Sequence, residues 1–158
     1  MDQEIKANLR IEVIVSAAFC FFINGMLSAL VFHQTDTVSL SHLFIAIDIS
    51  SVSMFVAIIT ALFSWSSVRR YKAVGIIVSG SRIMRQLSRL FRHPFLFGLL
   101  MGIAASLVFF ILAVLFLTLF KITELQFGVY LVLKTVFCGL LGAFTSFTCL
   151  YAGICKNE

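Results

Sequence analysis

Two residues of opposite charge interrupt long apolar stretches of the sequence, and they are the side chains best placed to do chemistry. Asp48 stands within the stretch from His42 to Trp65, and Lys134 stands within the stretch from Phe127 to Tyr151. A charge in hydrocarbon is costly unless it is paired or neutralised. Such residues therefore face the interior of a helix bundle, where they pair with one another, bind a solute or carry a proton.

The two charges also lie at matching positions. Asp48 is six residues from the start of its stretch and Lys134 is seven residues from the start of its own. At a rise of about 1.5 Å per residue, both lie roughly 10 Å below the same membrane surface. We therefore predict an Asp48–Lys134 ion pair, direct or bridged by water, and a candidate binding set of Asn24, Asp48 and Lys134. A buried network that only fixes the register between helices is the alternative.

The apolar stretches that carry these residues have the length of membrane-spanning helices. About 20 apolar residues in helical form cross a hydrocarbon core of about 30 Å. The chain is 61% hydrophobic and 12% charged, whereas a soluble domain is about half apolar and about a quarter charged. We expect an all-α integral membrane protein, a single bundle of four transmembrane helices formed by Ile11–Phe32, His42–Trp65, Phe95–Phe120 and Phe127–Tyr151.

The basic residues predict the orientation of the bundle. Of the 12 lysines and arginines, Lys121 lies on one side of the spans, Lys134 lies within a span, and the others flank the spans on the opposite side. Cytoplasmic loops carry the excess of basic residues, so both termini and the central segment are expected in the cytoplasm. We expect a multi-pass protein of the cell membrane, typically a bacterial inner membrane. Since topology accounts for the net charge of +5, no nucleic-acid partner is expected.

The central segment, residues 66–94, carries a helical pattern of its own. Its second half places apolar residues at helical spacing on one face and four arginines on much of the rest. This pattern predicts an amphipathic helix in the cytoplasmic interface, and Pro94 predicts the start of the next span. The helix is expected either to bind anionic lipids or a partner, or to be only a linker that obeys the positive-inside rule. Its basic residues are Arg82, Arg85, Arg89 and Arg92.

Similarity between the two halves of the chain predicts an internal repeat. The segment Asn24–Phe32 matches Met101–Phe109. Because both halves enter and leave on one side, we predict two tandem two-helix repeats, about 11–65 and about 95–154, related by an axis along the membrane normal. Chance similarity among apolar helices is the alternative. At a second offset, Asp48, Ser53, Ala57 and Thr60 match Lys134, Gly139, Ala143 and Ser146.

Other chemically capable side chains are interpreted more simply. Glu12, near the cytoplasmic end of the first span, is expected to be an interfacial carboxylate approaching Arg10, Arg89 or Arg92. The outer segment holds His33, Asp36 and His42, whose spacing matches no compact metal site. No metal site is predicted.

Several enzyme classes lack their motifs in this sequence. The four cysteines contain no CxxC pair, and the three histidines lie near span ends rather than within spans as haem ligands would. A nucleotide-phosphate loop and an HExxH motif are absent from the sequence. We therefore expect no enzymatic activity and no cofactor.

Three short motifs resemble those of small uncharacterised bacterial membrane proteins sometimes labelled permeases. The motifs are Ile23-Asn24-Gly25, Ala46-Ile47-Asp48-Ile49 and Ser67-Val68-Arg69-Arg70. The resemblance implies no particular substrate. We expect a permease-like transporter or channel component for a small polar solute or ion, working as a homo-oligomer because four helices enclose little space. The alternative is a non-catalytic accessory, immunity or regulatory subunit of a larger membrane complex.

Overall fold

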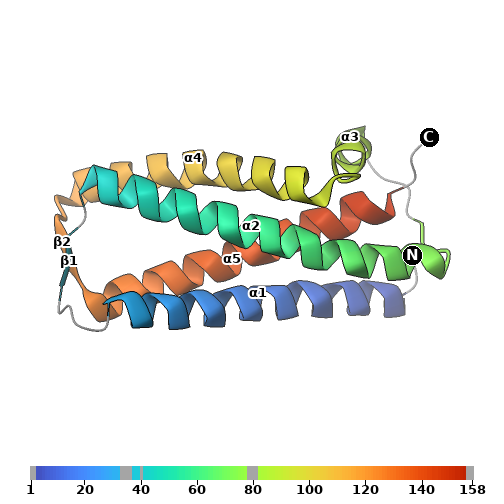
Figure 1. The fold of residues 1–158 in the computed structure, drawn as a ribbon, viewed down its shortest axis with the longest axis horizontal. Helices are drawn as coiled ribbons and strands as arrows, with labels where there is room; N and C mark the ends of the chain where they lie inside the picture. The colour runs from blue at the N-terminus through green and yellow to red at the C-terminus, as the bar shows by residue number, and fades with distance from the viewer. Residues whose placement is uncertain (1–2, 33–36, 40, 78–81, 156–158) are drawn as a thin grey trace.

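Four long helices form an elongated bundle, with a fifth, short helix at one end (Figure 1). This computed structural model describes residues 3–32, 37–39, 41–77 and 82–155. Within them, four helices are long and apolar enough to cross a membrane, which confirms the predicted bundle. The helices are α1 (Gln3–Phe32), α2 (His42–Ala73), α3 (Arg82–Leu90), α4 (Pro94–Phe120) and α5 (Phe127–Ile154).

Two of the long helices extend beyond the predicted spans. Helix α1 begins at Gln3 instead of Ile11, and α2 continues to Ala73 instead of ending near Trp65. The apolar stretches mark only the part of each helix that suits hydrocarbon, whereas a helix continues until a residue breaks it. For α2 the chain turns at Gly75, whose φ of 79° suits glycine. Helix α4 begins at Pro94, as predicted.

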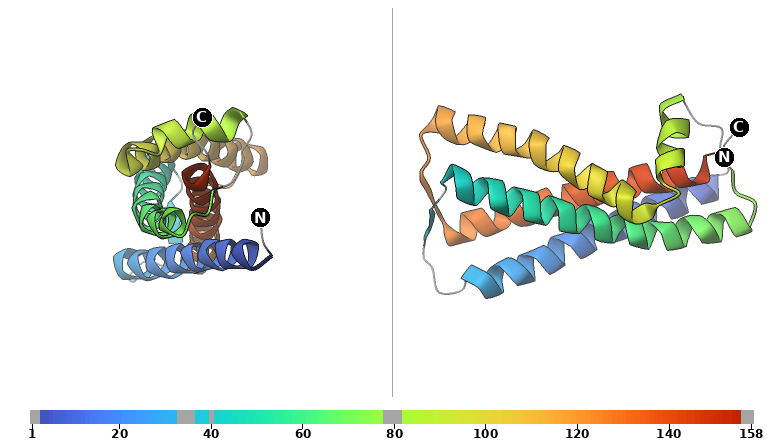
Figure 2. Two further views of the ribbon diagram at one scale, coloured as in Figure 1. Left: turned by 90° about the vertical axis from the view of Figure 1, so that its right-hand side faces the viewer. Right: turned by 45° about the horizontal axis from the view of Figure 1, so that its top comes forward.

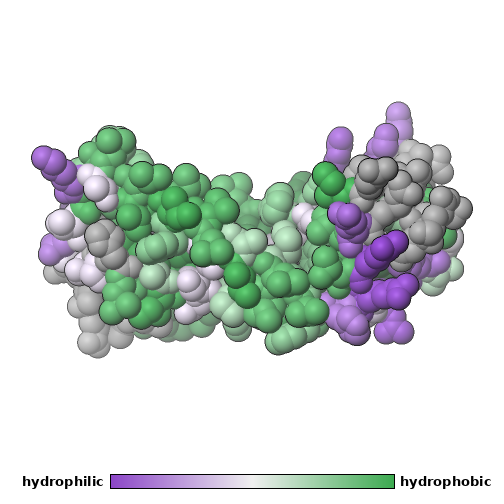
Figure 3. Space-filling model, turned by 90° about the horizontal axis from the view of Figure 1, so that it is seen from above, coloured by the Kyte–Doolittle hydropathy of each residue, from purple (hydrophilic) through white to green (hydrophobic). Residues whose placement is uncertain are grey.

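The two ends of the bundle differ in character. Helix α1 begins, α5 ends and α3 lies at one end, which we call the basic end; the opposite end is the strand end (Figure 1). Viewed over α4 and α3, the surface is apolar along most of its length, and hydrophilic groups gather chiefly at the basic end (Figure 3). This pattern suits a bundle whose long axis crosses a bilayer.

The connections at the strand end pair as a short β-ribbon, which the sequence analysis does not predict. Strand β1 (Thr37–Ser39) runs antiparallel to β2 (Glu124–Gln126), with Val38 opposite Leu125. Val38 is the buried residue of β1 and packs with Ile45 and Tyr130. One β-branched residue between two polar ones is the alternating pattern of a half-buried strand, so three residues suffice to join the connections.

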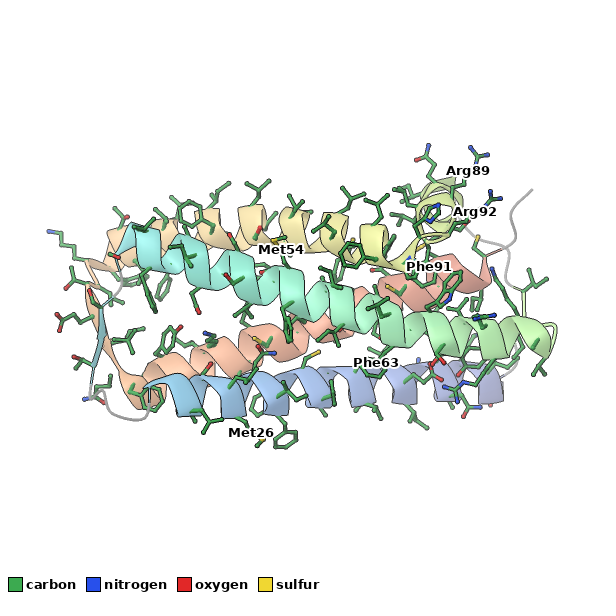
Figure 4. The ribbon with its side chains drawn as sticks, in the orientation of Figure 1. Met26, Met54, Phe63, Arg89, Phe91 and Arg92 are labelled. Atoms are coloured by element: carbon green, nitrogen blue, oxygen red, sulfur yellow. The ribbon has the colours of Figure 1, made fainter. Side chains whose placement is uncertain are left out.

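The helices are not packed in chain order. Helix α2 packs on α4, α1 packs on α5, and α2 and α5 form the central pair, running in the same direction. In the described chain, α1 and α2 are not closely packed although they are consecutive. Glycines bring the backbones of α4 and α2 close together: an added Cβ at Gly98 or Gly102 would lie 2.7 Å from the Cα of Ile58 or Met54, respectively. Met54 lies between α2 and α4 in Figure 4.

Helix α3 confirms the helix predicted in the central segment, and it lies across the basic end of the bundle (Figure 2). It is followed by Phe91, which is 2% exposed and packs edge-on against Trp65 and Phe97 at ring-centre distances of 5.5 and 5.2 Å. Arg89 and Arg92 point away from the bundle (Figure 4). The side chains of Arg82 and Arg85 are outside the described part of α3.

We expect Phe91→Leu to loosen the attachment of α3. Each edge-to-face ring contact contributes about 0.5–1.5 kcal/mol beyond burial, so the loss of two should cost about 2 kcal/mol. Limited trypsin digestion in mild detergent should then cut the α3 region faster than in the parent. The control is Ile83→Leu, because Ile83 is 69% exposed on the same helix; equal cutting of both variants would contradict this anchoring role.

Candidate functional site

The predicted Asp48–Lys134 ion pair is confirmed. Lys134 Nζ lies 2.5 Å from Asp48 Oδ1, and the two side chains are 10% and 21% exposed, respectively. They meet because α2 and α5 run in the same direction from the strand end, so residues a similar distance from their starts lie at one depth.

Tyr130 completes this ion-pair cluster, which sequence reasoning did not anticipate. Its hydroxyl donates to Asp48 Oδ2 at 2.7 Å and accepts from Lys134 Nζ at 3.2 Å. Tyr130 precedes Lys134 by four residues on α5, so the two side chains share one helix face. That spacing was visible in the sequence. Asp48 thus has a hydrogen-bond donor on each carboxylate oxygen.

An apolar cluster covers the ion-pair cluster from the strand end. Val38, Ile45 and Tyr130 are its buried members, with 4%, 5% and 7% exposure, and Phe44 and Leu125 pack against them. The β-ribbon supplies Val38 and Leu125. Apolar side chains therefore fill the bundle on the strand-end side of the ion pair, and Asp48 and Lys134 are bound to one another.

A groove of about 360 Å³ runs between α1 and α2 near the basic end. It exists because α1 packs on α5 and α4 packs on α2, which leaves the facing sides of α1 and α2 apart. Phe19 and Phe63 meet across it with ring centres 5.7 Å apart, and Figure 4 shows Phe63 between the two helices. Both rings are exposed, at 44% and 62%, so the groove opens sideways at the outer surface of the bundle.

The floor of the groove is polar although it lies well inside the spans. Cys20 Sγ lies 3.5 Å from Thr60 Oγ1, which links α1 to α2. Ser146 of α5 is 1% exposed, lines the groove, and has no hydrogen-bond partner for its hydroxyl among the described residues. The sequence feature that could have predicted the α2 side of the groove is a row of polar residues at helical spacing, Thr60, Ser64 and Ser67.

Glu12 stands at the mouth of the groove, but its partners differ from those predicted. Tyr71 Oη donates to Glu12 Oε1 at 3.1 Å, and Arg70 Nη2 lies 3.9 Å from the same oxygen. The expected partners were Arg10, Arg89 or Arg92. Helix α2 extends past its predicted end and so carries Arg70 and Tyr71 alongside α1, which places them nearer to Glu12.

A smaller cavity of about 150 Å³ continues the groove toward the strand end. It shares Phe19, Cys20 and Phe63 with the groove and reaches Asn24. The Asn24 amide nitrogen donates to the carbonyl of Cys20 at 2.9 Å, within its own helix.

Asn24 lies at the depth of the ion-pair cluster. Its neighbour Gly25 lies against Thr135, the residue after Lys134, where an added Cβ would be 3.0 Å from Thr135 Cγ2. The structure therefore brings Asp48 and Lys134 together and places Asn24 at their level, on the wall of the smaller cavity. A binding role for these three residues stays a prediction.

The described residues hold no group of three or more histidine, cysteine, aspartate or glutamate side chains that could bind a metal ion. The outer-segment residues His33 and Asp36, and the side chain of His42, lie outside the described part. Cys20, Cys138 and Cys149 are buried free thiols.

Comparison of the chain with protein-family models, curated proteins and solved structures finds no match. The ion-pair cluster, the groove and the basic end are therefore the features of the molecule that point to a function.

Proposed function

We propose that the protein is a permease-like membrane protein that passes a small polar solute, with its basic end in the cytoplasm. The observation that carries this proposal is the groove, which has polar side chains within membrane-spanning helices. Polar and ionisable groups within spans are costly to expose to lipid, and they often face a water-filled cavity or a path for a solute. The groove and the smaller cavity extend from Glu12 and Arg70 to Asn24, at the depth of the ion-pair cluster.

In this proposal the described conformation is open toward the basic end and closed toward the strand end. The ion-pair cluster of Asp48, Tyr130 and Lys134, with the apolar cluster around Val38, forms the closed outer gate. Passage of the solute requires α2 and α5 to separate there, so the pair has a gating role in addition to stabilising the bundle. Exchange between two such states is how alternating access operates.

The arrangement of the helices supports the proposed tandem repeat. A twofold axis between α2 and α5 would exchange α1 with α4, and each of these outer helices packs on the inner helix of the other half. The α1–α5 and α4–α2 contacts differ in register by about one helical turn. Phe21 lies against Gly139. In the predicted repeat Gly98 corresponds to Phe21 and Ser53 to Gly139, but Gly98 lies against Ala57 and Ile58 instead of Ser53. The symmetry of the proposed repeat is therefore approximate.

We further propose that the protein works as an oligomer held at an anionic lipid surface. A groove that opens sideways needs a second wall to separate a polar solute from lipid, and another copy of the chain would supply it. At the basic end, Arg89 and Arg92 are exposed next to Leu90, and Ile83 is 69% exposed. Basic and apolar side chains on one interfacial helix suit anionic headgroups and the acyl boundary.

Solute flux in proteoliposomes tests the proposed function. Stopped-flow light scattering would follow swelling under inward gradients of glycerol, erythritol, acetamide, lactate and ethanolammonium, with protein-free liposomes as the baseline. We expect faster swelling for at least one of these solutes. Ser64→Phe should return the rate to the baseline, because Ser64 is 4% exposed and lines the groove.

The matched control is Ser51→Phe, the same change at an exposed position of α2 outside the groove lining. It should keep the parent rate. Swelling at the baseline for every solute, or an unchanged rate in Ser64→Phe, would contradict the permease proposal.

A non-catalytic subunit of a larger membrane complex is the second candidate, and α3 is the observation that favours it. Its exposed Ile83 and the neighbouring arginines would also suit a protein partner. Gentle extraction followed by co-purification tests this candidate: a stoichiometric partner lost in Ile83→Asp supports it, and the absence of any co-purifying protein counts against it.

A further inference from the structure

The floor of the groove contains a buried hydroxyl that no described residue hydrogen-bonds. Ser146 is 1% exposed, lines the groove, and has no partner among the described residues. A buried polar group without a partner costs about 1–3 kcal/mol. A molecule in the groove that bonds Ser146 would remove this cost.

We propose that Cys20, Thr60 and Ser146 form the binding site for an uncharged solute that carries hydroxyl or amide groups. This inference rests on the proposed function and names the class of solute. The three side chains come from three helices, α1, α2 and α5, and all line the groove.

The charges of the groove exclude an ionic ligand at this depth. Among the described residues that line it, only Glu12 and Arg70 are charged, and they lie beside each other at the mouth. Arg70 follows Thr60 by ten residues, which is about 15 Å along a helix. Asp48 precedes Thr60 by twelve residues, which is about 18 Å. Asp48 is already bound to Lys134. An ion on the floor would have no nearby counter-charge within hydrocarbon depth.

The hydrogen-bonding groups of the floor indicate which functional groups the ligand carries. A serine or threonine hydroxyl both donates and accepts, and a thiol does so weakly. A solute that bonds these groups needs donors and acceptors of its own, as polyols and small amides have. The apolar walls, Phe19, Ile59 and Phe63, would pack against its carbon skeleton. The groove volume of about 360 Å³ is at the small end of ligand pockets, so the solute is small.

Protection of Cys20 from alkylation tests this site without any transport assay. Cys20 is the one cysteine among the described lining residues. Purified protein would be treated with N-ethylmaleimide, and modification of Cys20 followed by peptide mass spectrometry. We expect erythritol and acetamide to slow the reaction in a saturable manner, and lactate and ethanolammonium to leave it unchanged at equal concentration.

Two variants on adjacent residues assign the effect to the floor. Ser146→Ala removes one hydrogen bond and should raise the half-protecting concentration by roughly two- to tenfold. Thr145→Val is the control, because Thr145 is also buried with an unpartnered hydroxyl but does not line the groove. In this variant erythritol and acetamide should protect Cys20 at the same concentrations as in the parent.

Three results would overturn the proposed site: Cys20 that resists saturating reagent, equal protection by the charged probes, or an unchanged half-protecting concentration in Ser146→Ala. The outcome separates this inference from the proposed function. Specific protection without flux would keep the site and remove the permease. Flux without protection of Cys20 would keep the permease and remove this site.

Discussion

Lys134→Gln is expected to lower the free energy of unfolding by about 3 kcal/mol, because it leaves the Asp48 carboxylate buried without its cation. Asp48→Asn should have a similar effect by leaving Lys134 without its anion. The side chains are 10% and 21% exposed, so water relieves only part of either cost. Denaturant unfolding in mild detergent, followed by Trp65 fluorescence, would measure these changes.

The double variant Asp48→Asn, Lys134→Gln decides what the pair does. With both charges gone no uncompensated ion remains, so the double variant should recover most of the loss, and the cycle isolates the interaction between the two residues. Lys121→Gln is the control for loss of a lysine at an exposed site. Single variants as stable as the parent would mean that the charges are kept despite their desolvation cost, which favours a solute or proton site over a stabilising pair.

Gly102→Val should destabilise the bundle by about 3 kcal/mol, the upper part of the usual range for overpacking. An added Cβ at Gly102 would lie 2.7 Å from Met54 Cα and 3.1 Å from the Ser53 carbonyl oxygen, so α4 and α2 must move apart. Backbone atoms cannot rotate away as a flexible side chain can. The same unfolding measurement applies.

The control for this effect is Gly128→Val, at a position in α5 where an added Cβ meets nothing within 4 Å. Its effect should be small and of either sign, since glycine is itself a poor helix former. If the two variants were equally stable, α4 would not be seated on α2 as closely as Gly102 indicates.

The sequence predicted the spans and the ion pair because both depend on distance along a helix. Length and hydropathy fix which residues lie in hydrocarbon, and a constant rise per residue fixes the depth of Asp48 and Lys134. Their meeting also required α2 and α5 to be neighbours, which the repeat suggested. The β-ribbon was missed because β1 and β2 have three residues each and pair across most of the chain.

The order of helix packing could not be predicted from residue types. A membrane helix is apolar on most sides, and lipid tails are as apolar as leucine, so hydropathy does not distinguish a lipid-facing side from a packed one. The groove between α1 and α2 follows from that order. Its α2 wall was visible as the stripe of Thr60, Ser64 and Ser67, but the contributions of Cys20 and Ser146 from two other helices were not.

The pairing of α1 with α5 has a consequence for biosynthesis. Helix α1 packs mainly on α5, so it reaches its main partner only after α2, α3 and α4 have been synthesised. After membrane insertion, α1 and α2 lie in the bilayer without the helices that they pack against, α5 and α4. A chain truncated before α5 leaves α1 without its main partner, and such an unpacked helix is a substrate for quality-control proteases. Conversely, the halves expressed as separate polypeptides present interlocking surfaces and should reassemble in the same membrane.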